Sequence, residues 1–215
     1  MLDVILNNSA LVDDAVRILH LAAIAAGIGA VIATDLTMLR LLGVPIGSRH
    51  GAALEVAHRL IGPALLGAWV TGIALIGLRT GFAVETFSPK LWMKLAVVTA
   101  LSLNVLLIKR IVQPTLDEYE GWTLAEIPLA QKLSMALGGA ISVAGWSAAL
   151  FLGASRIFKT ASWELLVPTV GACFLTAALI TVSFAIVAHW RWRLGCWLRE
   201  RTTGRPHYGT LAPLR

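Results

Sequence analysis

Residues 28–43 of the chain read IGAVIATDLTMLRLLG, an aliphatic run with one acid, Asp35, near its middle. The residues on both sides of the acid are apolar for more than one helical turn, so a helix through this stretch suits the hydrocarbon of a membrane. A bare carboxylate is costly in that environment unless it is paired, bound or used. The stretch therefore predicts a membrane span and a defined role for its acid.

The composition of the whole chain is that of a membrane protein. Of its 215 residues, 57% are hydrophobic and 14% are charged, and the mean hydropathy is +0.77, which excludes an ordinary soluble domain. A helix needs about 20 mainly apolar residues to cross the hydrocarbon. Five stretches meet this requirement, at about 18–42, 54–78, 91–113, 132–155 and 165–189. We therefore predict an all-α bundle of five transmembrane helices within residues 1–189, followed by a basic tail at 190–215.

The distribution of Lys and Arg predicts the orientation of the bundle. Twelve of these residues fall on the side that holds 40–59, 109–132 and 190–215, and six fall on the other side. Basic residues are enriched on the cytoplasmic side of membrane proteins. We therefore expect a multi-pass protein of a bacterial inner membrane with its N-terminus outside and its C-terminus in the cytoplasm.

Basic charge in this chain lies beside the predicted spans. The net charge is +6, but no nucleic-acid-binding fold is visible, so nucleic acid is not an expected partner. The tail interleaves Trp190, Trp192 and Trp197 with arginines, a composition suited to lipid headgroups. We expect anionic lipid and other membrane-protein subunits as partners.

Two histidines lie at similar depth near the predicted cytoplasmic face, His58 at the start of the second span and His189 at the end of the fifth. Haem b between helices needs two neutral imidazoles from different helices at one level, with small neighbours that admit the ring. Gly62 and Ala185 supply such neighbours one turn further into the membrane. His58 and His189 are therefore candidate ligands of haem b, and the alternative is that both are interfacial residues at helix ends.

A third histidine, His20, lies near the outer end of the first span. Met93, at the start of the third span, is at comparable depth and could complete a His/Met site for haem or copper. The alternative is an interfacial histidine without a metal. Cys173 and Cys196 form no CxxC or CxxCH motif, which argues against c-type haem and against a thiolate metal site.

Asp35 itself has two interpretations. Its depth matches that of Arg59 on the second span, so the two could form an ion pair that ties the first two spans together. Alternatively, Asp35 relays protons or binds a cation or a ligand, since ionisable residues inside a membrane are functional candidates. Both interpretations stay open at the level of sequence.

Motifs in the first three spans resemble those of a known group of proteins. They are TMLRLLG at 37–43, VTGIAL at 70–75 and SPKLWMKLAVVTALSLNVLL at 88–107, together with His20 before a glycine-containing span. The chain resembles uncharacterised bacterial multi-span membrane proteins related to the copper-resistance D-like group. The resemblance implies an association with haem b or copper, which would extend to His20 and to His58.

Three functions are compatible with these features. The first is a b-type cytochrome-like subunit for electron transfer or membrane anchoring, and the second is a cofactor-free scaffold or accessory subunit of a larger membrane complex. The third is a small transporter that uses Asp35. The sequence has no nucleophile triad, Walker loop or HExxH motif, so enzymatic turnover by this chain alone is not expected.

Overall fold

The computed structural model of the chain describes residues 2–40, 44–155 and 157–203. Within these ranges the fold is all-helical, as predicted. The long helices are α1 (Leu2–Arg40), α2 (Ser48–Thr80), α3 (Pro89–Leu107), α5 (Leu129–Ala154) and α6 (Trp163–Thr203). Five helical segments are long and apolar enough to cross a membrane. The prediction of a multi-pass membrane bundle is thereby confirmed.

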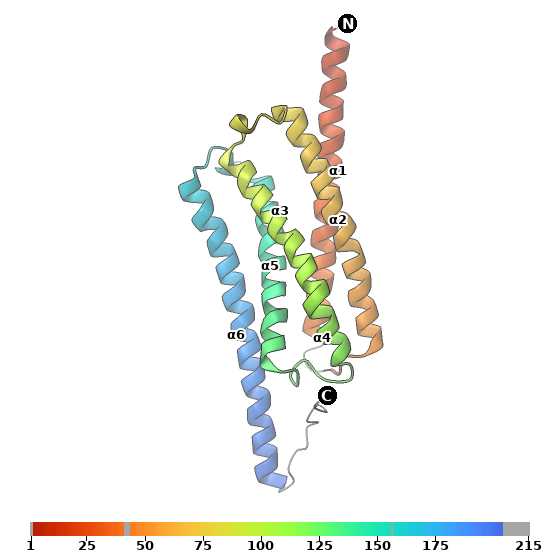
Figure 1. Cartoon of the computed structure of the whole chain (residues 1–215), viewed down its shortest axis with the longest axis vertical. Coiled ribbons are helices and arrows are strands. Elements are labelled where there is room, and N and C mark those ends of the chain that lie inside the picture. The colour runs from red at the N-terminus through yellow and green to blue at the C-terminus, as the bar shows by residue number, and fades with distance from the viewer. Residues whose placement is uncertain (1, 41–43, 156, 204–215) are drawn as a thin grey trace.

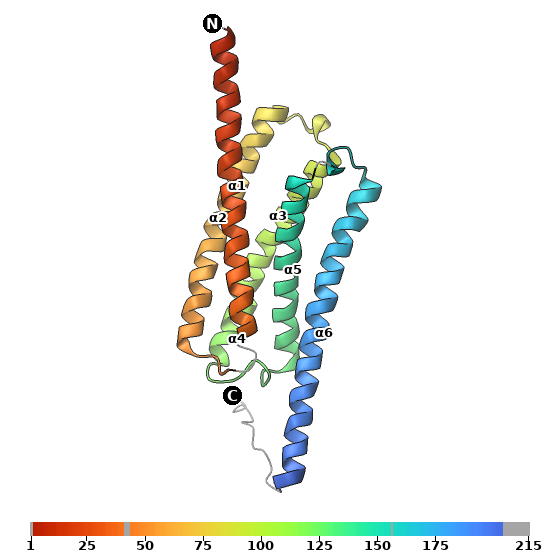
Figure 2. The same cartoon turned by 180° about the vertical axis from the view of Figure 1, so that it is seen from behind.

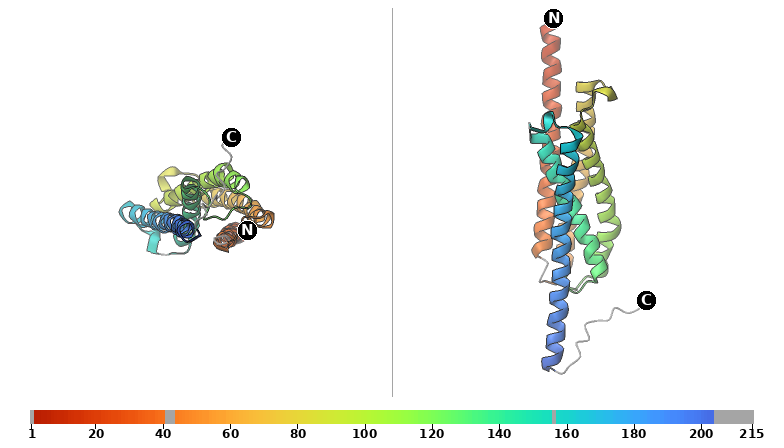
Figure 3. Two further views of the ribbon diagram at one scale, coloured as in Figure 1. Left: turned by 90° about the horizontal axis from the view of Figure 1, so that it is seen from below. Right: turned by 90° about the vertical axis from the view of Figure 1, so that its left-hand side faces the viewer.

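The helices form two antiparallel pairs, α1 with α2 and α5 with α6, and α3 packs mainly on α5. Seen end-on, α1 and α2 lie on one side of the bundle and α6 on the other, with α3 and α5 between them (Figure 3). Helix α1 packs mainly on α2, and α6 packs mainly on α5. The start of α1 and the end of α6 project from opposite ends of the bundle (Figures 1 and 2).

The regular hydrogen bonding of α3 ends at Leu107, but the chain stays helical beyond it. It runs into a π-helical segment, Ile108–Val112, and then into α4 (Gln113–Glu118). Pro114 has no amide hydrogen to donate to the carbonyl of Arg110, so the regular helical ladder cannot continue through this turn. The wider turn of the π-helix comes directly before this break. Such segments are rare and often lie at functional sites.

The core is small and lies where the two pairs meet. Its centre is formed by Trp146 of α5 with Leu101 and Val97 of α3, all at most 4% exposed. Most other large apolar side chains are exposed on the outer surface of the bundle, as expected where lipid replaces water as the solvent. Close backbone approach therefore has to hold the helices together.

At the end of the bundle that carries α4, two connections are joined to each other. Ile46, after α1, donates its amide to the carbonyl of Trp122 at 2.8 Å and accepts from the amide of Gly121 at 2.7 Å. The side chains of Ile46, Tyr119 and Ile127 form a second buried cluster there. We call this end of the molecule the α4 end.

Candidate functional site

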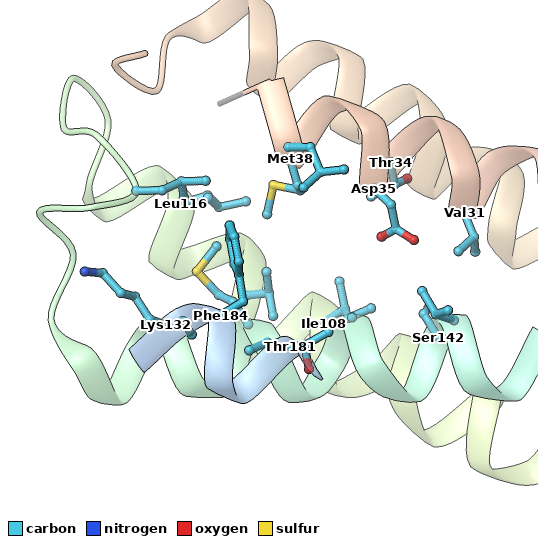
Figure 4. Close-up of a pocket in the computed structure, with 18 of the residues that line it drawn as sticks. Val31, Thr34, Asp35, Met38, Ile108, Leu116, Lys132, Ser142, Thr181 and Phe184 are labelled. Carbon is cyan, nitrogen blue, oxygen red and sulfur yellow. The ribbon is translucent and has the colours of Figure 1, made fainter. Parts of the chain in front are cut away.

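A cavity of about 480 Å³ lies between α1 and the group formed by the π-helical segment Ile108–Val112, α4, α5 and α6, towards the α4 end (Figure 4). Ile61 of α2 also lines it. Most of its lining is aliphatic, and Met38, Met135 and Phe184 add two thioethers and one aromatic ring. Its polar lining residues are Thr34, Asp35, Gln113, Lys132, Ser142 and Thr181. The cavity thus combines apolar walls with a few polar groups, which is typical of sites for small molecules.

Asp35 is the acid of this cavity. It is partly buried on α1, and its carboxylate points away from α1 into the cavity, towards α5 and Ile108 (Figure 4). Among the described residues no hydrogen bond or ion pair to this carboxylate is found. Asp35 therefore faces an open space rather than a protein partner.

Arg59, the partner predicted from sequence, is placed differently. It is exposed on α2 and does not line the cavity. Both side chains belong to the described part of the chain, and no ion pair joins Asp35 to Arg59 there. The structure thus turns Asp35 towards the π-helical segment, α5 and α6 rather than towards Arg59 of α2.

Two threonine hydroxyls of the cavity lining make hydrogen bonds within their own helices. The Thr34 hydroxyl donates to the carbonyl of Ala30 at 2.9 Å, and the Thr181 hydroxyl donates to the carbonyl of Ala177 at 3.0 Å. Each hydroxyl therefore uses its hydrogen within its own helix and does not donate it to Asp35. Ser142 Oγ accepts from Asn104 Nδ2 at 3.4 Å.

Asn104 supports the cavity wall from behind. It is 3% exposed, and its Nδ2 also donates to the carbonyl of Gly138 at 2.9 Å, which links α3 to α5. Its Oδ1 has no hydrogen-bond partner in the described structure. Asn104 therefore braces α3 against α5 behind the cavity.

Lys132 lies at the α4 end of the cavity (Figure 4) and is 7% exposed. Its ammonium donates to the carbonyl of Ala125 at 2.5 Å and approaches His189 Nδ1 at 3.3 Å. An ammonium has donors only, so His189 Nδ1 accepts and the imidazole proton lies on Nε2. The sequence offered Lys132 only as one basic residue beside a span. Its burial depends on the connection that folds over it.

The residues predicted to hold haem b are only partly described. Residue 58 lies within α2, but its side chain is outside the described residues. An imidazole coordinates iron through a nitrogen lone pair. The hydrogen bond from Lys132 occupies Nδ1 of His189 and leaves the proton on Nε2. Coordination of iron by His189 would require this contact and this tautomer to change, and haem binding stays a prediction.

His20 and Met93 have separate environments. His20 Nδ1 lies 2.8 Å from the Thr71 hydroxyl oxygen, whose hydrogen is donated to the carbonyl of Gly67. His20 Nδ1 therefore carries the proton, and its Nε2 keeps a lone pair that could bind a metal. Met93 packs in the apolar core at 9% exposure. In the described ranges no three His, Cys, Asp or Glu residues come close enough to hold a metal ion.

Comparisons with known proteins return no matching family model, no matching curated protein and no matching solved structure. The fold therefore defines the class of this protein as a multi-pass helical membrane protein. The cavity at Asp35 has polar and ionisable lining residues, whereas a second cavity, between α1 and α2, is lined by apolar residues.

Proposed function

We propose that this protein is a membrane carrier for a small, mainly apolar organic molecule, which binds in the cavity at Asp35. The observation that carries the proposal is a cavity of about 480 Å³ between apolar helices, with an acid that has no protein partner facing into it. Sites for small molecules have volumes of roughly 300–1,000 Å³ and apolar walls with few polar groups. Intramembrane acids mark the paths of substrates or ions.

The arrangement of the helices supports a carrier rather than a rigid scaffold. The cavity lies between α1, which packs mainly on α2, and the group formed by the π-helical segment, α4, α5 and α6. Carriers commonly move one group of helices against another around a binding site between them. The π-helical segment contributes Ile108 and Val112 to the cavity wall, and its irregular hydrogen bonding gives that wall a place to adjust. Electron transfer has less support, because Lys132 occupies His189 Nδ1.

The test fills the cavity without disturbing the backbone. A Cβ atom added to Gly139, which lines the cavity, would meet nothing within 4 Å, and the same holds for Gly153 on the same helix outside the cavity. Gly139→Leu therefore inserts a side chain into the site, and Gly153→Leu is its matched control. Gly139 lies in the interior of α5 and Gly153 in its last turn, so the control reports the effect of an added leucine outside the cavity.

The probes share one apolar ring system: 1-naphthalenemethanol, 1-naphthylmethylamine and 1-naphthoate, each radiolabelled. We expect saturable binding of at least one probe to the protein in phosphatidylcholine nanodiscs. Gly139→Leu should weaken that binding about tenfold or more, and Gly153→Leu should leave it unchanged. The bound probe should also cross proteoliposome membranes faster with the parent protein than with Gly139→Leu. Absence of saturable binding for all three probes, or equal losses in both variants, contradicts the proposal.

A further inference from the structure

We propose that the cavity selects a positively charged ligand: an apolar organic molecule with one protonated amine, whose ammonium group is held by the carboxylate of Asp35. This inference rests on the proposed function of the cavity and adds the charge class of its ligand. Three features of the lining support it.

The first feature is the balance of charge along the cavity. Asp35 and Lys132 are the only ionisable side chains among the lining residues. The ammonium of Lys132 is held at the α4 end by the carbonyl of Ala125 and by His189. The carboxylate of Asp35 has no such partner among the described residues. A cation beside Asp35 would remove the cost of an uncompensated charge, which is large where water is scarce.

The second feature is the type of hydrogen bond that the lining can make. Thr34 and Thr181 spend their hydroxyl hydrogens on backbone carbonyls, so neither hydroxyl donates to Asp35. A protonated primary amine brings three donors and no acceptor, so it complements the carboxylate of Asp35. A ligand carboxylate would bring further acceptors and a like charge to the same place.

The third feature separates an organic cation from an inorganic one. A hard metal ion needs about six oxygen ligands at close range, whereas the lining around Asp35 is mainly aliphatic, with Val31, Ile108 and Val143 among its members. The volume of about 480 Å³ is that of an organic molecule rather than a single ion. Phe184 adds a ring face, which attracts organic cations.

The experiment compares the three naphthalene probes on the same protein in uncharged lipid. The parent protein should bind the amine about tenfold or more tightly than the alcohol, and the naphthoate most weakly, because a hydrogen-bonded charge pair adds to the shared apolar contribution. Asp35→Asn should abolish the preference for the amine while the alcohol binds within about threefold of the parent. Asp35→Glu should retain the preference.

The matched control is Asp14→Asn, which removes an exposed acid from the same helix outside the cavity. It should keep the full preference for the amine.

If the parent protein binds the alcohol as tightly as the amine, with both sensitive to Gly139→Leu, the charge class is wrong and the cavity proposal stands. If Asp14→Asn loses the preference as Asp35→Asn does, the surface charge of the protein explains it and Asp35 is not the counter-ion. The probe comparison on the parent protein decides the charge class even if Asp35→Asn does not fold.

Discussion

The indole of Trp146 on α5 lies against the backbone of Gly27 on α1, in the space that a side chain at position 27 would need. A Cβ atom on Gly27 would lie only 2.6 Å from Cζ3 of this indole. Trp146 is 4% exposed and belongs to the central core. Asp35 follows Gly27 by about two turns of the same helix. The contact therefore sets how closely α1 approaches α5 beside the cavity.

Replacing Gly27 by Ala should destabilise the bundle, because the indole must move and the small core offers it no other space. We expect a loss of about 1–3 kcal/mol, typical of overpacking, seen as a lower midpoint of thermal unfolding in detergent. Gly29→Ala is the control, since a Cβ there would meet nothing within 4 Å, and it should be neutral or slightly stabilising. Equal midpoints for the two variants would show that α1 and α5 do not meet at this point.

The helices of this fold could be predicted from sequence because the hydrocarbon sets the length of the apolar part of each span. The fourth predicted span, 132–155, differs from α5 (Leu129–Ala154) by at most three residues at either end. The hydropathy of a sequence marks the part of a helix that lies in lipid. It does not mark the residue at which the helix ends. Helix α6 accordingly continues from the predicted boundary at His189 to Thr203, so the described part of the predicted tail continues the fifth span as one helix.

The cavity could be anticipated only in part. An acid inside an apolar span stands out in the sequence, so Asp35 is predicted as a candidate functional residue. Its neighbours depend on how each helix is rotated about its axis and on which helices meet, and hydropathy carries little of that information. Sequence depth alone therefore paired Asp35 with Arg59, whereas the rotation of α1 turns Asp35 towards Ile108 and Ser142 of the cavity wall.

Asp35→Asn should leave the thermal stability of the ligand-free protein unchanged or raise it, because the carboxylate has no partner to lose in the described structure and a neutral amide is less costly in an apolar cavity. The measurement is a double-mutant cycle with Arg59→Gln, followed by thermal unfolding. Additive effects are expected. A drop for Asp35→Asn that Arg59→Gln partly reverses would establish the ion pair predicted from sequence.

The contact between Lys132 and His189 should contribute to stability. His189→Leu removes one of the two acceptors that the buried ammonium has in the structure, and a buried donor left unsatisfied costs about 1–3 kcal/mol. Lys132→Met combined with His189→Leu should recover most of that loss, because no unsatisfied charge remains. Thermal unfolding of the two single variants and the double variant measures the coupling. Purely additive losses would mean that the two side chains do not interact.

The haem hypothesis leads to a prediction that separates two histidines. His189 is engaged by Lys132 with its proton on Nε2, whereas His20 keeps a lone pair on Nε2 through its bond to Thr71. Any haem b that the protein binds should therefore be independent of His189. Reduced-minus-oxidised absorption spectra of protein prepared with haem supplied should be the same for the parent and His189→Ala, and any haem signal should weaken in His20→Ala. Loss of the Soret band in His189→Ala alone would show that haem displaces Lys132 from Nδ1 and would restore His189 as a ligand.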